Sequence, residues 1–216
     1  MGDVEKFERD LEQLVASLTT RLDEKSSAQL MRLEDSLVEL HRENVVKINH
    51  SVMELVCAKH LVLKGYDLQV EHRLDAALTC DLYGVKGYGS MIVEIETGFI
   101  PPDHALDPMT YTAARIASKI IRYSNHAGRF ALGVPPHYVL PFQEALTSPP
   151  SDRTHRQVAQ IKELCDRYYQ NPPITVEEIR HACIHAIYII YVDRLDVEEV
   201  DPETYIKNRC VAIERS

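Results

Sequence analysis

Two short apolar runs that carry carboxylates, joined by a glycine-rich turn, constrain the fold of this chain more than any other feature. The first run contains Asp81, the second contains Glu94 and Glu96, and glycines occupy the turn between them. Two strands joined by a hairpin would bring Asp81 beside Glu94 and Glu96 at the end of a buried layer. Buried carboxylates are costly without a counter-ion, and a hard divalent cation suits oxygen ligands. The pattern therefore predicts a metal site at the end of a β-hairpin.

The composition limits the classes of protein to which the chain can belong. Its 216 residues are 45% hydrophobic and 26% charged, as in a soluble globular protein. No run approaches the roughly 18 apolar residues of a membrane span, and the first residues lack the pattern of a signal peptide, so we expect a cytoplasmic protein. The net charge of −9 excludes a uniformly basic polyanion binder, so any contact with nucleic acid must use a local basic surface.

The N-terminal segment predicts helix, because apolar residues recur every three or four positions over residues 3–48. The phase of this pattern breaks at 23–27, where Ser26-x-x-Gln29 has the form of a capping box. The segment is therefore either a helical hairpin or one long helix with a stutter. We expect residues 1–43 to form a helical arm, as a hairpin or coiled coil, that braces the protein or joins two copies in a homodimer.

Beyond the arm, helices and strands alternate. Helices are predicted at 44–64, 110–127, 153–170 and from Thr175, and strands at 67–75, 77–86, 90–97, 129–134 and 186–193. The acidic residues 194–216 predict a surface tail. We therefore expect residues 44–216 to form an α/β domain with a mixed β-sheet flanked by helices.

The order of elements from 44 to 134 resembles the core of the PD-(D/E)XK nuclease superfamily, which includes archaeal Holliday-junction resolvases and RecB-like nucleases. Sites of that family place a glutamate on the first helix, an aspartate on the second strand, and an acidic residue followed by x-Lys on the third. Glu54, Asp81 and Glu94 match the three acidic positions. The resemblance implies a restriction-endonuclease-like core with Mg²⁺ or Mn²⁺ as cofactor.

The chain departs from the family pattern on the third strand, where Glu96 replaces the lysine. A Glu-x-Glu variant occurs in some restriction enzymes that resemble this family. A lysine can also come from the next helix, where Arg115, Lys119 and Arg122 recur at i, i+4 and i+7 and share one face. Lys119 and Tyr123 have the spacing of the Gln-x-x-x-Tyr motif of RecB-like nucleases. Either Glu96 or Lys119 could therefore take the place of the missing lysine.

The resemblance implies a role for each of these residues. Glu54, Asp81 and Glu94 would be metal ligands, and Asp81, Glu94, Glu96 and Lys119 would be catalytic. The metal would polarise the scissile phosphate and lower the pKa of a bound water. Since alternate residues of a strand share a face, Glu94 and Glu96 would point the same way, and Asp81 must lie on that side of the sheet.

The stripe Arg115, Lys119 and Arg122 has two interpretations. No acidic residue interrupts it between 110 and 131, so it could supply the local basic surface that DNA binding requires. It could also be the solvated face of an amphipathic helix.

Together these features predict a Mg²⁺- or Mn²⁺-dependent deoxyribonuclease that acts in repair or recombination, with DNA as its partner and no membrane. One alternative is a catalytically inactive nuclease-fold module that binds nucleic acid or scaffolds a partner. Another is a coiled-coil interaction protein, for which the helical arm is the only support.

Overall fold

The strands form one six-stranded mixed sheet in which sequence neighbours are also spatial neighbours. The computed structural model describes residues 2–213, and side chains as far as residue 208. The strands are β1 (Asp67–Arg73), β2 (Thr79–Lys86), β3 (Gly89–Ile95), β4 (Arg129–Val134), β5 (Ala186–Tyr191) and β6 (Asp196–Val200). Strands β1 to β3 pair antiparallel, β3 to β5 pair parallel, and β6 returns antiparallel to β5. The expected α/β class with a mixed sheet is confirmed.

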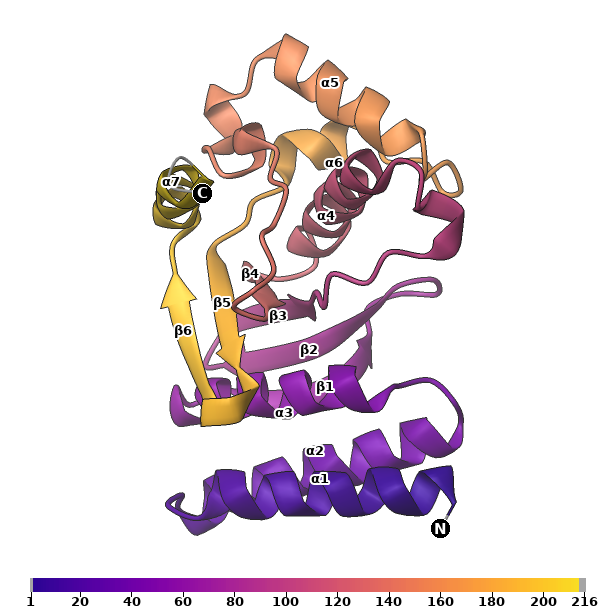
Figure 1. The fold of residues 1–216 in the computed structure, drawn as a ribbon. Coiled ribbons are helices and arrows are strands. Elements are labelled where there is room, and N and C mark those ends of the chain that lie inside the picture. Colours follow the sequence, from indigo (N-terminus) through magenta and orange to yellow (C-terminus); the bar gives the residue numbers. More distant parts are fainter. Residues whose placement is uncertain (1, 214–216) are drawn as a thin grey trace.

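Helices cover both faces of the sheet (Figure 1). They are α1 (Asp3–Thr19), α2 (Glu24–Arg42), α3 (Ile48–Leu63), α4 (Pro108–Ser124), α5 (His155–Asp166), α6 (Val176–His181) and α7 (Pro202–Ile213). One hydrophobic cluster joins α1, α2 and α3 to one face, and a second joins α4, α5 and α6 to the other. Of the helices described, none is long and apolar enough to cross a bilayer.

The N-terminal helices form the hairpin that was one of two expectations for the arm. The break falls where Asp23 caps α2 by accepting a hydrogen bond from the Ser26 amide, so α2 begins before the capping box expected at Ser26. The apolar stripes of both helices, which include Phe7, Leu11 and Leu37, are buried in the same cluster as α3. These helices therefore brace the sheet, and a homodimer through them, which stays a prediction, would have to use their other faces.

The expected surface tail is wrong for the residues described beyond 194. Strand β6 pairs with β5, and α7 follows it. Strand β6 is an edge strand of five residues in which only Val197 is buried, so it lacks the apolar alternation by which a strand is recognised. By contrast, β4 spans the predicted residues 129–134, where an apolar run ends at a pair of prolines.

Candidate active site

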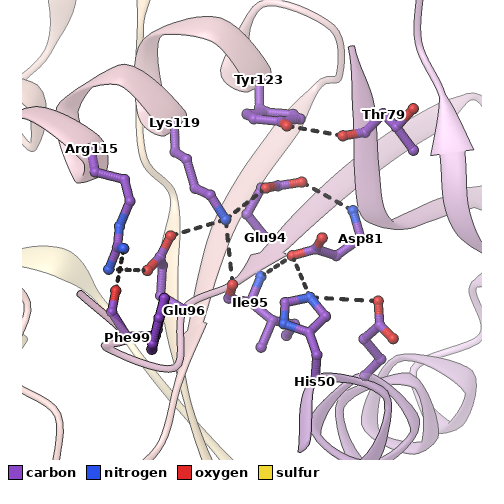
Figure 2. A network of polar contacts seen from close by, with 11 residues as sticks. His50, Thr79, Asp81, Glu94, Ile95, Glu96, Phe99, Arg115, Lys119 and Tyr123 are labelled. Carbon is purple, nitrogen blue, oxygen red and sulfur yellow. Dashed lines mark hydrogen bonds and ion pairs between the residues drawn. The ribbon is translucent and has the colours of Figure 1, made fainter. Parts of the chain in front are cut away.

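The predicted carboxylates meet at the end of the β2–β3 ladder, where hydrogen bonds between backbone and side chains replace those between backbones. The register of the ladder ends at Leu82 and Val93. Beyond it, the Asp81 amide donates to Glu94 Oε1 at 3.0 Å, and the Ile95 amide donates to Asp81 Oδ2 at 2.5 Å. Figure 2 shows the two carboxylates on either side of this junction. Because each is bonded to the neighbouring strand, both are held in fixed positions inside the sheet.

The side chains on either side of Asp81 in strand β2 point to opposite faces of the sheet. Leu82 packs in the cluster on the α3 face, whereas Cys80 packs in the cluster on the α4 face. Residues two apart in a regular strand share a face, so the strand is distorted between them. Asp81 was expected on the same side as Glu94 and Glu96. It lies instead at the crossing point, where it contacts both Glu94 and His50 of α3.

Glu94 and Glu96 point together toward α4, as the alternation of β3 predicted, and Lys119 joins them (Figure 2). Lys119 Nζ lies 3.0 Å from Glu94 Oε2 and 3.0 Å from Glu96 Oε1. Arg115 reaches Glu96 Oε2 at 3.0 Å. The lysine of the following helix therefore enters the site from the side, and Glu96 is neutralised by two cations.

Burial and charge set opposite pKa shifts in the two central carboxylates. Burial, followed by the charge of Asp81, raises the pKa of Glu94 to about 8, although Lys119 opposes this shift. Burial also acts to raise the pKa of Asp81, but the charge of Lys119 and the hydrogen bond from His50 outweigh it and lower that pKa. Of these two carboxylates, Asp81 is therefore the one that stays ionised.

The basic stripe of α4 faces the sheet and its flanking loops. Arg115 and Lys119 are tied to the carboxylates of β3, and Arg115 also donates to the Phe99 carbonyl. Arg122 donates to the Pro172 carbonyl at 2.7 Å. The shared face predicted from the spacing is present, but Arg115 and Lys119 are not a solvated face, and contact of the stripe with DNA stays a prediction.

Four side chains on α3, β1 and β2 come close enough to share one metal ion. His50, Glu54, Glu71 and Asp81 each offer one ligand atom, and these atoms all lie within 4.8 Å of one another. His50 Nε2 is 3.2 Å from Asp81 Oδ2 and 3.8 Å from Glu54 Oε1. Glu94, predicted as a ligand, is not in this group.

The sequence interpretation missed His50 and Glu71. His50 stands one helical turn before Glu54, so the i, i+4 spacing of a histidine and an acid on α3 could have revealed it. Glu71 alternates with apolar residues of β1 like any solvent-facing strand residue, and no local signal distinguishes it.

Glu54 is the least compensated group of the site. Its side chain is fully buried, and neither carboxylate oxygen has a hydrogen-bond partner among the described residues. Burial, and then the charges of Asp81 and Glu71, raise the pKa of Glu54 well above its ordinary value. A buried carboxylate without donors is destabilising unless it is protonated or faces a cation. The site therefore lacks positive charge on its α3 side, and a divalent cation there would supply it.

The donor set fits a divalent ion. Three carboxylates and one imidazole are hard and borderline ligands of the kind that bind Mg²⁺, Mn²⁺ and related ions. On the α4 side, Lys119 supplies a fixed positive charge next to Glu94. The site thus combines a group of residues that could hold a metal ion with a permanent cation, Lys119.

Tyr123 closes the site at the far end of α4. Its hydroxyl donates to the Thr79 carbonyl at 2.9 Å, at the start of β2 (Figure 2). Burial and the charge of Glu94 raise the pKa of this hydroxyl, so it stays a neutral donor. Tyr123 therefore fastens α4 to β2 and positions Lys119, one turn earlier, over β3.

The comparisons with known proteins give no further assignment. No family model matches the chain, and neither the curated proteins nor the solved structures contain a significant match.

Proposed function

We propose that the protein is a metal-dependent deoxyribonuclease that hydrolyses phosphodiester bonds at the site formed by Asp81, Glu94 and Lys119. One observation carries this proposal. The buried carboxylate of Glu54, which has no hydrogen-bond partner in the described part of the chain, lies beside Asp81 and His50, in a group whose ligand atoms could hold one ion. The order of α3, β1 to β3 and α4 around these residues is the order that the resemblance to PD-(D/E)XK nucleases implies, and it also supports the proposal.

The residues divide into two sets. On the α3 side, Asp81, Glu54 and His50 would hold a divalent ion, which polarises a phosphate and acidifies a water when bound. On the α4 side, Lys119 holds a positive charge 3.0 Å from Glu94, where it can stabilise charge that develops on a phosphate oxygen. Glu96 orients Lys119 by a second ion pair.

A second candidate function is a nuclease-fold module that binds nucleic acid without cutting it. The observation that favours it is the double pairing of Lys119 with Glu94 and Glu96, which leaves the lysine little charge to offer a substrate. The two candidates differ in whether metal binding is accompanied by cleavage.

The test is cleavage of labelled single-stranded, duplex and branched DNA with Mn²⁺, Mg²⁺ or EDTA. The variants are Asp81→Asn and Glu163→Gln, the second being an exposed carboxylate of α5 far from the site. We expect metal-dependent cutting by the wild type and by Glu163→Gln, and none by Asp81→Asn. Metal binding and DNA binding without cutting would support the second candidate. Equal cutting by Asp81→Asn would refute the proposed site.

A further inference from the structure

We propose that Glu71 is a metal ligand held in place by strained backbone, and that it completes with His50, Glu54 and Asp81 a site selective for transition-metal ions such as Mn²⁺ over Mg²⁺. The inference deepens the proposed function and rests on its metal site. It adds a residue on β1 that the family pattern does not contain and narrows the class of the ion.

The backbone of Glu71 adopts an unfavourable conformation within a strand. Its φ angle is 45°, in the left-handed region that non-glycine residues seldom occupy. The ladder of β1 with β2 pairs Val70 with Leu82 and His72 with Cys80, and skips Glu71. A glutamate has no steric reason to occupy such a position, where glycine would be tolerated without strain. The position therefore gains something from the side chain, since strained residues concentrate at functional sites.

What the conformation achieves is to bring the Glu71 carboxylate to the residues of α3 and β2. Its oxygen lies with His50 Nε2, a Glu54 oxygen and an Asp81 oxygen in a group no more than 4.8 Å across. Ligands about 2.1 Å from one octahedral ion are about 3.0 Å apart when adjacent and about 4.2 Å apart when opposite. The 3.2 Å and 3.8 Å separations from His50 to Asp81 and Glu54 lie within that range. Small side-chain movements would thus close the group around one ion.

A cluster of acids alone would not establish a binding site, but Glu54 supplies independent support. It is fully buried, points into this group, and has no hydrogen-bond donor for either oxygen among the residues described. His50 Nε2 lies 3.8 Å from Glu54 Oε1, and it is closer to Asp81 Oδ2, at 3.2 Å. A cation between these side chains would satisfy Glu54, and Glu71 closes the side of the group that β1 borders.

The imidazole decides the class of ion. Mg²⁺ favours oxygen ligands and retains several waters, whereas Mn²⁺ and the later divalent ions accept nitrogen more readily. Three carboxylates keep the site hard enough for Mn²⁺. A site with one histidine and three acids is therefore expected to bind Mn²⁺ more tightly than Mg²⁺.

The experiment measures Mn²⁺ and Mg²⁺ binding by calorimetry, and Tm in EDTA, for the wild type and four variants. Glu71→Gln keeps the backbone and removes the charge, and Glu71→Gly removes both the ligand and the strain. His50→Ala removes the nitrogen ligand. Asn44→Gly is the matched control, because Asn44 has a φ angle of 62° and is exposed at the end of α2.

We expect both Glu71 variants to lose Mn²⁺ affinity by about tenfold or more. Glu71→Gly should also raise the Tm in EDTA by roughly 2–4 °C, because relief of the strain stabilises a chain that has lost its ligand. His50→Ala should bring the Mn²⁺ affinity closer to the Mg²⁺ affinity, because it removes the nitrogen ligand. Asn44→Gly should leave metal affinity unchanged.

Wild-type Mn²⁺ affinity in Glu71→Gln would overturn the inference, and so would a wild type that binds Mg²⁺ as tightly as Mn²⁺. These outcomes are distinct from failure of the proposed function. Glu71-dependent Mn²⁺ binding without DNA cleavage would uphold the ligand and refute the nuclease. Metal-dependent cleavage at the same rate in Glu71→Gln and the wild type would uphold the nuclease and refute Glu71 as a ligand.

Discussion

Lys119 Nζ lies 3.0 Å from Glu94 Oε2, so a cation from α4 neutralises a carboxylate that β3 buries almost completely. The same nitrogen is 3.0 Å from Glu96 Oε1. One lysine thus joins the helix to the sheet and compensates two acids. The same side chain holds α4 to the sheet and, in the proposed function, acts on the substrate, which makes it the most informative position to change.

Replacing Lys119 with methionine should destabilise the protein by about 3 kcal/mol, because it leaves two buried carboxylates without their shared cation. The proposed DNA cleavage should fall about 10²–10³-fold in the same variant. Thermal unfolding and single-turnover cleavage measure the two effects separately.

Lys162→Met is the matched control for this change. Lys162 pairs with Asp166 on the surface of α5, where both side chains are partly exposed. Surface pairs contribute about 0–1 kcal/mol, so this variant should unfold within about 1 kcal/mol of the wild type. Equal losses in Lys119→Met and Lys162→Met would contradict the view that Lys119 compensates buried charge.

Glu54→Gln should have opposite effects with and without metal. In EDTA the variant should be more stable than the wild type by about 1–3 kcal/mol, since it removes a buried carboxylate to which no residue of the described chain donates a hydrogen bond. With Mn²⁺ present the wild type should gain stability that the variant lacks, because ligand binding to the native state raises the free energy of unfolding. Denaturant unfolding in both conditions measures this crossover. A variant that is less stable than the wild type in EDTA would show that Glu54 has compensation within the chain.

The sequence predicted the parts of the site that follow from local pattern. The hairpin and the alternation of β3 brought Asp81, Glu94 and Glu96 together, and the helical spacing of α4 placed Lys119 on the face toward them. Predicted strand boundaries agreed best with the structure where turn residues flank an apolar run, as in β4.

What the sequence did not reveal depends on contacts between distant segments. The left-handed backbone of Glu71 is not indicated by any residue preference, since glutamate seldom adopts it. The distortion of β2 at Asp81, which places Cys80 and Leu82 on opposite faces of the sheet, is likewise not indicated by the local sequence pattern. Strand β6 forms because an edge of the sheet is available to it, although its own residues are mostly acidic and exposed.

The stability of the arm should fall with rising pH because of Glu34 on α2. Burial, followed by the charges of Asp35, Glu12 and Glu8, raises the pKa of Glu34 to about 7. When the pKa of a carboxyl is higher in the folded state than in the unfolded state, the free energy of unfolding of the protein falls as pH rises between the two pKa values. For Glu34 this fall lies between about pH 4.5 and about pH 7, and the stability stays lower above that range.

Glu34→Gln should therefore match the wild type in Tm near pH 4 and have a higher Tm near pH 8. The gain in free energy of unfolding should be at most about 1 kcal/mol, because solvent screens this half-buried group. Glu39→Gln, an exposed change on the same helix, controls for the removal of a negative charge from α2. The measurement is Tm against pH for the three proteins, and a parallel course for all of them would contradict the assignment to Glu34.

One added methyl group at Gly133 on β4 should destabilise the protein. A Cβ built there would lie 2.7 Å from Ile95 Cδ1 and 2.8 Å from Ile190 Cδ1, closer than side-chain carbons approach. Overpacking of this kind costs about 1–3 kcal/mol, so Gly133→Ala should lower the free energy of unfolding by that amount. Since the Gly133 carbonyl also accepts the Glu96 amide at 2.7 Å, displacement of β4 would disturb the carboxylates as well. Gly89→Ala, whose nearest contact would be an ordinary 3.5 Å, should change neither stability nor metal binding. Equal stability of Gly133→Ala and Gly89→Ala would show that the side chains around Gly133 can move to accept a methyl group, and would contradict this prediction.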